Sequence, residues 1–110
     1  MKRSGESAVV RACLDYLLRL RKLVAWRSNN AGIFSQARAR YIFHGLKGVP
    51  DIIVILPGGR FLGVECKSET GRQSEAQMEF QAQCEKAGEL YVLAHSAAEL
   101  AEKMKEIERG

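Results

Sequence analysis

Two acidic residues and a lysine stand at a spacing that suits phosphate chemistry. Asp51 precedes an apolar run at 52–56, and Glu65 and Lys67 lie at the end of the run at 60–67. Glu65 and Lys67 are two residues apart, so their side chains lie on the same face of a strand. Carboxylates and a lysine at one end of an apolar hairpin are costly to bury unless an ion or a partner compensates them. Mg²⁺ does so with a few carboxylate oxygens, water and phosphate. The alternative is a plain ion pair of Lys67 with one carboxylate at a sheet edge.

The loop of this hairpin determines whether the two carboxylates can meet. A two-residue loop at 58–59 would pair Asp51 with Cys66. Because successive side chains of a strand alternate between faces, Glu65 would then lie on the face opposite Asp51. A three-residue loop at 57–59, with a glycine in the left-handed conformation, pairs Asp51 with Glu65 instead. The sequence therefore predicts this odd loop, or a bulge with the same effect.

Two further polar residues stand where helices could bring them to this site. Glu6 begins an apolar stripe at helical spacing, formed by Val10, Cys13, Leu17 and Leu20. A carboxylate in the first turn gains from the helix dipole on any face, so its place on the core face indicates another role, such as completing a metal site. Gln77 follows Ser74 in a capping-box pattern, and it either caps the helix or points toward metal or phosphate.

The elements that must position these residues alternate in an α/β order. We expect a helix from Gly5 to about Lys22, a strand at 23–27, a long irregular stretch at 29–48, a hairpin at 52–67, a helix at 75–87, a strand at 90–94 and a last helix capped by Ser96 and Glu99 with Leu100, Met104 and Ile107 inward. A helix between the strands that end at Glu65 and begin at Leu90 implies a right-handed parallel crossover. The prediction is a mixed β-sheet flanked by helices, in the order αβββαβα.

Length and composition limit the class of protein. The chain has 110 residues, enough for one domain, with 46% hydrophobic and 27% charged residues, as in globular proteins. Its net charge of +4 suits a polyanionic partner. Cys13, Cys66 and Cys84 are too few and too widely spaced for a disulfide framework or a zinc site, which indicates free thiols. With no export or membrane signal, we expect a cytoplasmic protein without a membrane partner, in a bacterium or in the host of a phage.

Together these residues resemble the VRR-NUC domain of the PD-(D/E)xK nuclease superfamily. The motifs that carry the resemblance are Glu6, Gly48–Val49–Pro50–Asp51, Glu65–Cys66–Lys67, and Gly71–Arg72–Gln73–Ser74 with Gln77. The resemblance spans Glu6 to about Leu93, so residues 1–110 are expected to form a single VRR-NUC domain. It implies a restriction-endonuclease-like fold similar to that of the archaeal Holliday junction resolvases.

The resemblance also implies a catalytic mechanism. Asp51, Glu65 and the backbone carbonyl of Cys66 would hold Mg²⁺ or Mn²⁺, and Glu6 would reach the ion directly or through water. Lys67 would lie beside the attacking water and stabilise the transition state. Together with Gln77, these side chains are the candidate catalytic residues for hydrolysis of DNA phosphodiester bonds.

A group of mostly basic residues around the metal motif is expected to contact DNA phosphates. Its members are Arg38, Arg40, Lys47, Arg72 and Gln73. The alternative for the basic residues at 38–47 is a solvated loop. The resemblance implies a homodimer, since its relatives among junction resolvases are dimeric and one small domain offers one metal site for two strands. The expected substrate is branched DNA such as a four-way junction. A general DNA nuclease and a non-catalytic basic DNA-binding module are the alternatives.

Overall fold

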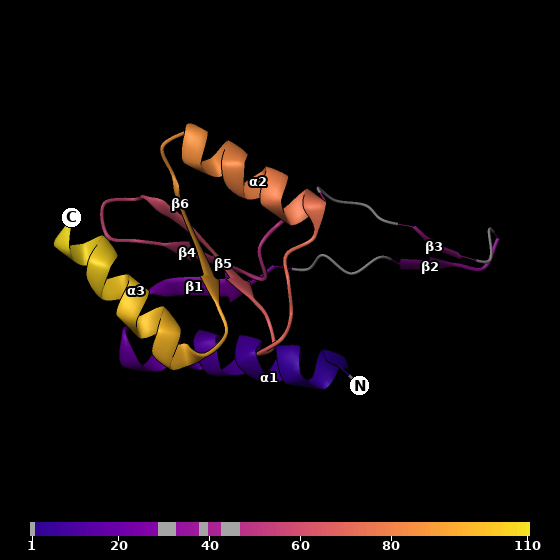
Figure 1. Ribbon diagram of the computed structural model, residues 1–110, viewed down its shortest axis with the longest axis horizontal. Coiled ribbons are helices and arrows are strands. Elements are labelled where there is room, and N and C mark those ends of the chain that lie inside the picture. Colours follow the sequence, from indigo (N-terminus) through magenta and orange to yellow (C-terminus); the bar gives the residue numbers. More distant parts are fainter. Residues whose placement is uncertain (1, 29–32, 38–39, 43–46) are drawn as a thin grey trace.

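A four-stranded sheet with both antiparallel and parallel pairs forms the centre of the protein (Figure 1). The computed structural model describes residues 2–28, 33–37, 40–42 and 47–110. The strand order is β1 (Val24–Arg27), β4 (Ile52–Ile55), β5 (Phe61–Cys66) and β6 (Leu90–Ala94). β1, β4 and β5 are antiparallel neighbours, and β6 runs parallel to β5. The predicted mixed sheet, with the 52–56 segment as an inner strand, is confirmed.

Helices cover the two faces of this sheet unequally. α1 (Lys2–Asp15) and α3 (Ala97–Arg109) lie on one face, and α2 (Glu75–Lys86) lies on the other (Figure 1). The main core lies between the sheet and the helices α1 and α3. It is formed by Val10, Cys13, Leu17, Ile52, Val54, Leu62, Val64, Cys66, Val92, Ala94, Leu100 and Met104. α2 buries no residue completely, because it covers β6 and leaves the β1 side of its face open. None of the helices described is long and apolar enough to cross a membrane.

A short hairpin inside the 29–48 stretch was not predicted. β2 (Ile33–Ser35) and β3 (Arg40–Ile42) pair antiparallel and project away from the main sheet (Figure 1). Strands of three residues that pair only with each other leave little periodicity in a sequence, which is why this stretch read as irregular. Apart from this insertion, the core elements follow the predicted order αβββαβα.

The first helix differs from the prediction at both ends. It begins at Lys2 rather than Gly5, and after Asp15 it continues as a π-helical turn, η1 (Tyr16–Leu20). The wider π turn shifts the following side chains around the helix axis. Leu20 is consequently 63% exposed, although the apolar stripe predicted it to be buried. The rest of the stripe, from Val10 to Leu17, is buried as expected.

The hairpin that carries the acidic motif has the predicted odd loop. Ile52 pairs with Val64, and the Leu56 N–H donates to the Arg60 carbonyl at 2.8 Å, so residues 57–59 form a three-residue loop. Gly58 and Gly59 adopt φ values of +91° and +85°, which L side chains rarely adopt. Extending this register by one residue places position 51 opposite position 65.

Serine residues cap the two helices that follow β5. Ser74 and Gln77 form the complete capping box predicted for α2. At α3 the Ser96 hydroxyl accepts from the Glu99 N–H at 3.0 Å, but the Glu99 carboxylate accepts from the His95 N–H and not from the Ser96 N–H. The second predicted box is therefore only half formed, because the His95 backbone N–H provides a competing donor for the Glu99 carboxylate.

Candidate active site

Asp51 is fixed at the beginning of β4 by backbone contacts on two sides. The Ser28 N–H donates to the Asp51 carbonyl at 2.8 Å, and the Ser28 hydroxyl donates to the Pro50 carbonyl at 2.6 Å. On the β5 side, Asp51 Oδ2 accepts from the Cys66 N–H at 2.8 Å. The carboxylate therefore lies between the two strands, next to the backbone of the Glu65–Cys66–Lys67 segment.

Two glycines allow the segment before Asp51 to approach its neighbours closely. Gly48 has a φ of +82°, and a Cβ atom there would lie 2.2 Å from the Ala76 carbonyl oxygen at the start of α2. On β5, a Cβ atom at Gly63 would lie 2.7 Å from Pro50 Cγ. The chain can follow this path only because neither position carries a side chain. These contacts explain the glycine three residues before the aspartate and the glycine on β5 next to Pro50.

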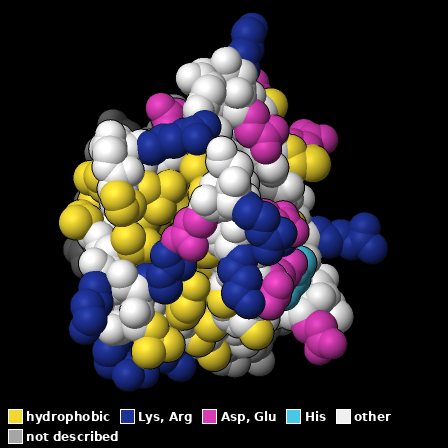
Figure 2. Space-filling view, turned by 90° about the vertical axis from the view of Figure 1, so that its left-hand side faces the viewer, with side chains coloured by type: hydrophobic (Ala, Val, Ile, Leu, Met, Phe, Trp, Pro, Cys, Tyr) yellow, Lys and Arg dark blue, Asp and Glu magenta, His cyan; other side chains and the backbone are white. Residues whose placement is uncertain are grey.

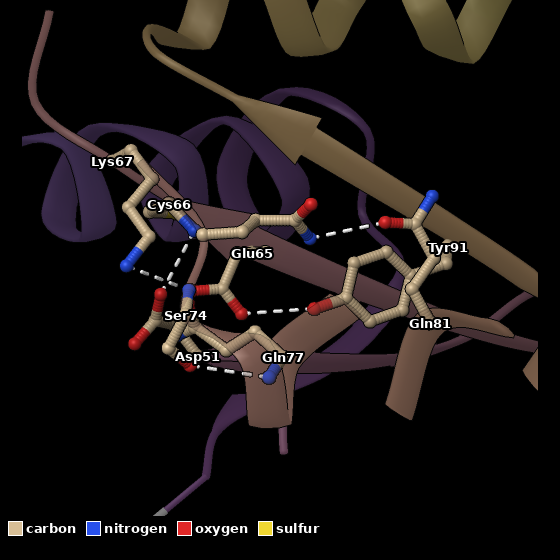
Figure 3. A network of polar contacts seen from close by, with 9 residues as sticks. Asp51, Glu65, Cys66, Lys67, Ser74, Gln77, Gln81 and Tyr91 are labelled. Atoms are coloured by element: carbon tan, nitrogen blue, oxygen red, sulfur yellow. Dashed lines mark hydrogen bonds and ion pairs between the residues drawn. The ribbon is translucent and has the colours of Figure 1, made fainter. Parts of the chain in front are cut away.

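Glu65 is a fully buried carboxylate with hydrogen-bond donors on both oxygens (Figure 3). Oε1 accepts from the Tyr91 hydroxyl at 2.9 Å, and Oε2 accepts from Gln77 Nε2. The Lys67 ammonium lies 3.5 Å from Oε2, with its side chain 11% exposed. The ion pair considered from the sequence is thus present, but it is buried and shares the carboxylate with two other donors.

Gln77 forms the predicted cap and also contacts Glu65, one of the two proposed metal ligands. Its amide oxygen accepts from the Ser74 N–H at 2.8 Å, which completes the capping box, while its amide nitrogen donates to Glu65 (Figure 3). The Ser74 hydroxyl in turn accepts from the Gln77 N–H at 3.1 Å. The cap therefore fixes the orientation in which the amide nitrogen reaches the carboxylate.

The two carboxyl groups have raised pKa values. Burial, followed by the nearby charge of Asp51, raises the pKa of Glu65 to about 7, although Tyr91 and Lys67 act to lower it. Burial raises the pKa of Asp51, and the charge of Glu6 adds to this effect against the hydrogen bond from Cys66. The site thus has more negative charge than its own cations balance, a condition that a divalent cation would relieve.

Glu6 approaches the site from α1. The helix comes close to the end of β5, where a Cβ atom at Gly5 would lie 3.5 Å from Ser68 Cβ. Glu6 is half-buried, and its charge acts on Asp51. Among the residues that the structure describes, no three Asp, Glu, His or Cys side chains gather closely enough to hold an ion. An ion would rest on Asp51 and Glu65, with water and phosphate in the remaining positions, which is the arrangement Mg²⁺ favours.

Cys66 contributes its backbone rather than its thiol. Its side chain is fully buried in the core on the α1 side of the sheet, beside Cys13. A hydrogen bond with Cys13 and burial raise the pKa of the Cys66 thiol far above its usual value, so it remains protonated. All three cysteines are free, as the sequence indicated.

The predicted DNA-contacting residues are only partly visible. Arg38 lies outside the described residues, as does the side chain of Arg40. Lys47 is exposed four residues before Asp51, and Arg72 is exposed five residues after Lys67. The Gln73 amide donates to Gln81 Oε1 at 3.0 Å, so in this structure it points toward α2. DNA contact by these residues stays a prediction.

Tyr91 was not identified from the sequence. It lies in β6, 26 positions after Glu65, and reaches that carboxylate because β6 is parallel to β5 in a register that pairs Gly63 with Tyr91. The available signal was a hydroxyl inside an otherwise apolar strand, since a buried tyrosine usually needs a hydrogen-bond partner. Burial and the Glu65 charge raise the pKa of Tyr91 well above its usual value, so its hydroxyl is a donor.

Comparisons with known proteins agree on one family. The family profile described as the VRR-NUC domain matches residues 9–98. A solved structure titled "VRR_NUC domain" is 20% identical, covers 92% of this chain and 95% of its own, and has a TM-score of 0.60. Another, titled "VRR_NUC domain protein", is 18% identical, covers 96% and 85%, and has a TM-score of 0.61. These likenesses show that the restriction-endonuclease-like fold is shared. No curated protein matches the chain significantly.

Proposed function

The chain belongs to the VRR-NUC family of nuclease-type domains, and from this premise we propose that it is an endonuclease that uses Mg²⁺ or Mn²⁺ to hydrolyse DNA phosphodiester bonds. The observation that carries the proposal is the meeting of Asp51, Glu65 and Lys67 at one end of β4 and β5. The carboxyl groups of Asp51 and Glu65 have raised pKa values, which is common where charge is arranged for catalysis.

Each side chain has a defined part in this mechanism. Asp51 and Glu65 would hold the ion with the Cys66 carbonyl, and Glu6 would act on it from α1. The bound ion supplies charge neutralisation at the scissile phosphate and lowers the pKa of water. Lys67, whose ammonium already lies at Glu65, would orient the attacking water and stabilise charge on the transition state. Gln77 keeps Glu65 in place from α2. The expected product is a nicked strand with a 5′-phosphate.

The proposed substrate is branched DNA of the four-way-junction type. A twofold dimer would present two such sites to a junction that needs two cuts. Exposed apolar side chains around β1 support a second copy on that side: Leu18, Leu20, Val24, Trp26 and Ile55 are 41–63% exposed. Figure 2 shows hydrophobic side chains gathered on the side of the molecule where β1 begins. Arg72 and Lys47 would contact phosphates beside the site.

Cleavage assays test this function directly. Purified protein is incubated with a labelled four-way junction, a flap and a linear duplex, each with Mg²⁺ or with EDTA. We expect Mg²⁺-dependent nicking, fastest on the junction. The Asp51→Asn variant keeps an acceptor for the Cys66 N–H, so it should fold but cleave at least about 100-fold more slowly. An active Asp51→Asn variant would refute the site.

Two other results would point to the alternative functions. Equal rates on all three substrates would indicate a general DNA nuclease. Binding without metal-dependent cutting of any substrate would favour a basic DNA-binding module instead. The presence of both carboxylates, the lysine and Glu6 argues against that module, because a binding surface gains nothing from burying acidic groups beside phosphate.

A further inference from the structure

The Tyr91 hydroxyl lies against the proposed metal site, although Tyr91 is not among the residues that would bind the ion. Tyr91 is 8% exposed, and its hydroxyl donates to Glu65 Oε1 at 2.9 Å. The side chain reaches the carboxylate from β6, a strand that otherwise contributes only apolar side chains (Figure 3).

The surroundings of Tyr91 fix the direction of its hydroxyl. Its ring packs against Phe80 of α2, with ring centroids 6.5 Å apart. A phenol has one hydrogen to donate, and the Tyr91 hydroxyl directs it to Glu65 Oε1. The pKa of Tyr91 lies well above its usual value, because of burial and the Glu65 charge, so the hydroxyl keeps this hydrogen.

Both oxygens of the carboxylate are consequently held from opposite sides. Tyr91 holds Oε1, whereas Gln77 and Lys67 hold Oε2. The terminal torsion of a glutamate is broad and nearly twofold, so donors on both oxygens restrict the carboxylate plane more than donors on one oxygen alone. Partners that orient a ligand carboxylate commonly determine metal affinity as strongly as the ligand itself.

We propose that Tyr91 is a positioning residue, which holds the Glu65 carboxylate in the orientation that binds the divalent ion. The inference rests on the proposed function, because it concerns the same site.

The test is the Tyr91→Phe variant, which removes the hydroxyl and keeps the ring. Mn²⁺ binding to the metal-free protein without DNA is measured by electron paramagnetic resonance, alongside kcat and KM for junction cleavage. We expect roughly 10- to 100-fold weaker Mn²⁺ binding, a matching rise in the Mn²⁺ concentration that gives half-maximal cleavage, and an unchanged KM for DNA. Tyr16→Phe is the matched control, because it removes a hydroxyl that accepts from Arg21 at the far end of the first helix. Tyr16→Phe should change neither the affinity for Mn²⁺ nor the Mn²⁺ concentration that gives half-maximal cleavage.

Several outcomes separate this role from a structural one. If Tyr91→Phe lowers the unfolding temperature but binds Mn²⁺ as tightly as the wild type, the positioning role is refuted. If Tyr91→Phe does not fold, Phe80→Leu decides, because it removes the ring that packs against Tyr91: weaker Mn²⁺ binding supports the role, and unchanged Mn²⁺ binding refutes it. A wild-type protein that neither binds Mn²⁺ nor cuts DNA would overturn the proposed function itself, and this role with it.

Discussion

At the scale of single residues, the site combines features that oppose folding. Glu65 is fully buried, yet it shares its surroundings with the Asp51 carboxylate, and its pKa is raised to about 7. Hydrogen bonds from Tyr91 and Gln77 and the Lys67 ammonium offset only part of this cost. Such groups are retained where a ligand supplies the missing charge, so the stability of the protein should depend on that ligand.

We expect the metal-free protein to lose stability as pH rises through the range in which Glu65 ionises. The pKa of Glu65 is about 7 in the folded protein against 4.5 as its ordinary value, so between these values the folded state binds more protons than the unfolded chain. The stabilisation that protonated Glu65 gives the folded state is fully present below pH about 4.5 and is lost as the pH rises through about 7. Glu65→Gln cannot ionise there, so the gap in unfolding free energy between variant and wild type should change by about 3 kcal/mol from pH 4.5 to pH 8.

Urea unfolding of both proteins in EDTA at several pH values measures this difference, and comparing the change across pH removes any constant effect of the new amide. Added Mg²⁺ should reduce the difference at pH 8, because the ion binds the ionised wild-type site and not the variant. Parallel pH curves for the two proteins would contradict the assigned ionisation of Glu65.

At the scale of elements, a helix cap and a contact to the proposed metal site meet in one residue, Gln77. Ser74 begins α2 and orients Gln77, whose amide then holds Glu65. Ser96 begins α3 with the same hydroxyl-to-backbone contact, on the opposite face of the sheet and outside the site. The two serines therefore allow the cost of losing a cap to be separated from the cost of losing the orientation of Gln77.

Ser74→Ala and Ser96→Ala should each destabilise the protein by about 1 kcal/mol, because each removes one capping hydrogen bond. Only Ser74→Ala should also slow DNA cleavage, by several-fold, since losing the bond from the Gln77 N–H to the Ser74 hydroxyl loosens the first turn of α2, which carries the Gln77 amide to Glu65. Thermal unfolding and initial cleavage rates at saturating Mg²⁺ measure the two effects. Equal cleavage rates for both variants would show that the cap does not support the site.

Local signals made much of this arrangement predictable. The requirement that Asp51 and Glu65 share one site predicted the three-residue loop at 57–59, because a two-residue loop would pair Asp51 with Cys66; the structure has this loop, with two glycines in the left-handed conformation. Ser74 and Gln77 predicted the cap because capping boxes are encoded within four residues. Features that depend on contacts between distant segments were missed: Tyr91 reaches Glu65 through the parallel β6 register, and the π turn that exposes Leu20 has no pattern of its own in the sequence.

At the scale of the whole molecule, the two faces of the sheet are covered to different extents. α1 and α3 close one face, while α2 on the other leaves β1 and the adjoining part of β4 open (Figure 1). Val24 pairs with Ile55 there, and the two side chains are 60% and 41% exposed. Trp26, on the same face of β1, is 46% exposed. Contiguous apolar patches of this kind usually mark an interaction surface.

The proposed homodimer gives this surface an occupant, and Trp26 tests it. A second copy packed on β1 would bury the indole, so Trp26→Lys would place an unpaired charge in the interface and weaken the dimer by at least about 100-fold. Light scattering coupled to size exclusion should then change from twice 12.3 kDa to 12.3 kDa, with an unchanged circular dichroism spectrum.

Glu102→Lys is the control for charge, because Glu102 is exposed on α3, which covers the opposite face of the sheet. It should leave the dimer intact. Because each monomer keeps its own carboxylates, Trp26→Lys should still nick single strands of a junction while losing the paired cuts that resolve it. A wild-type protein that is monomeric at every concentration, or a Trp26→Lys variant that remains dimeric, would contradict a dimer built on this face.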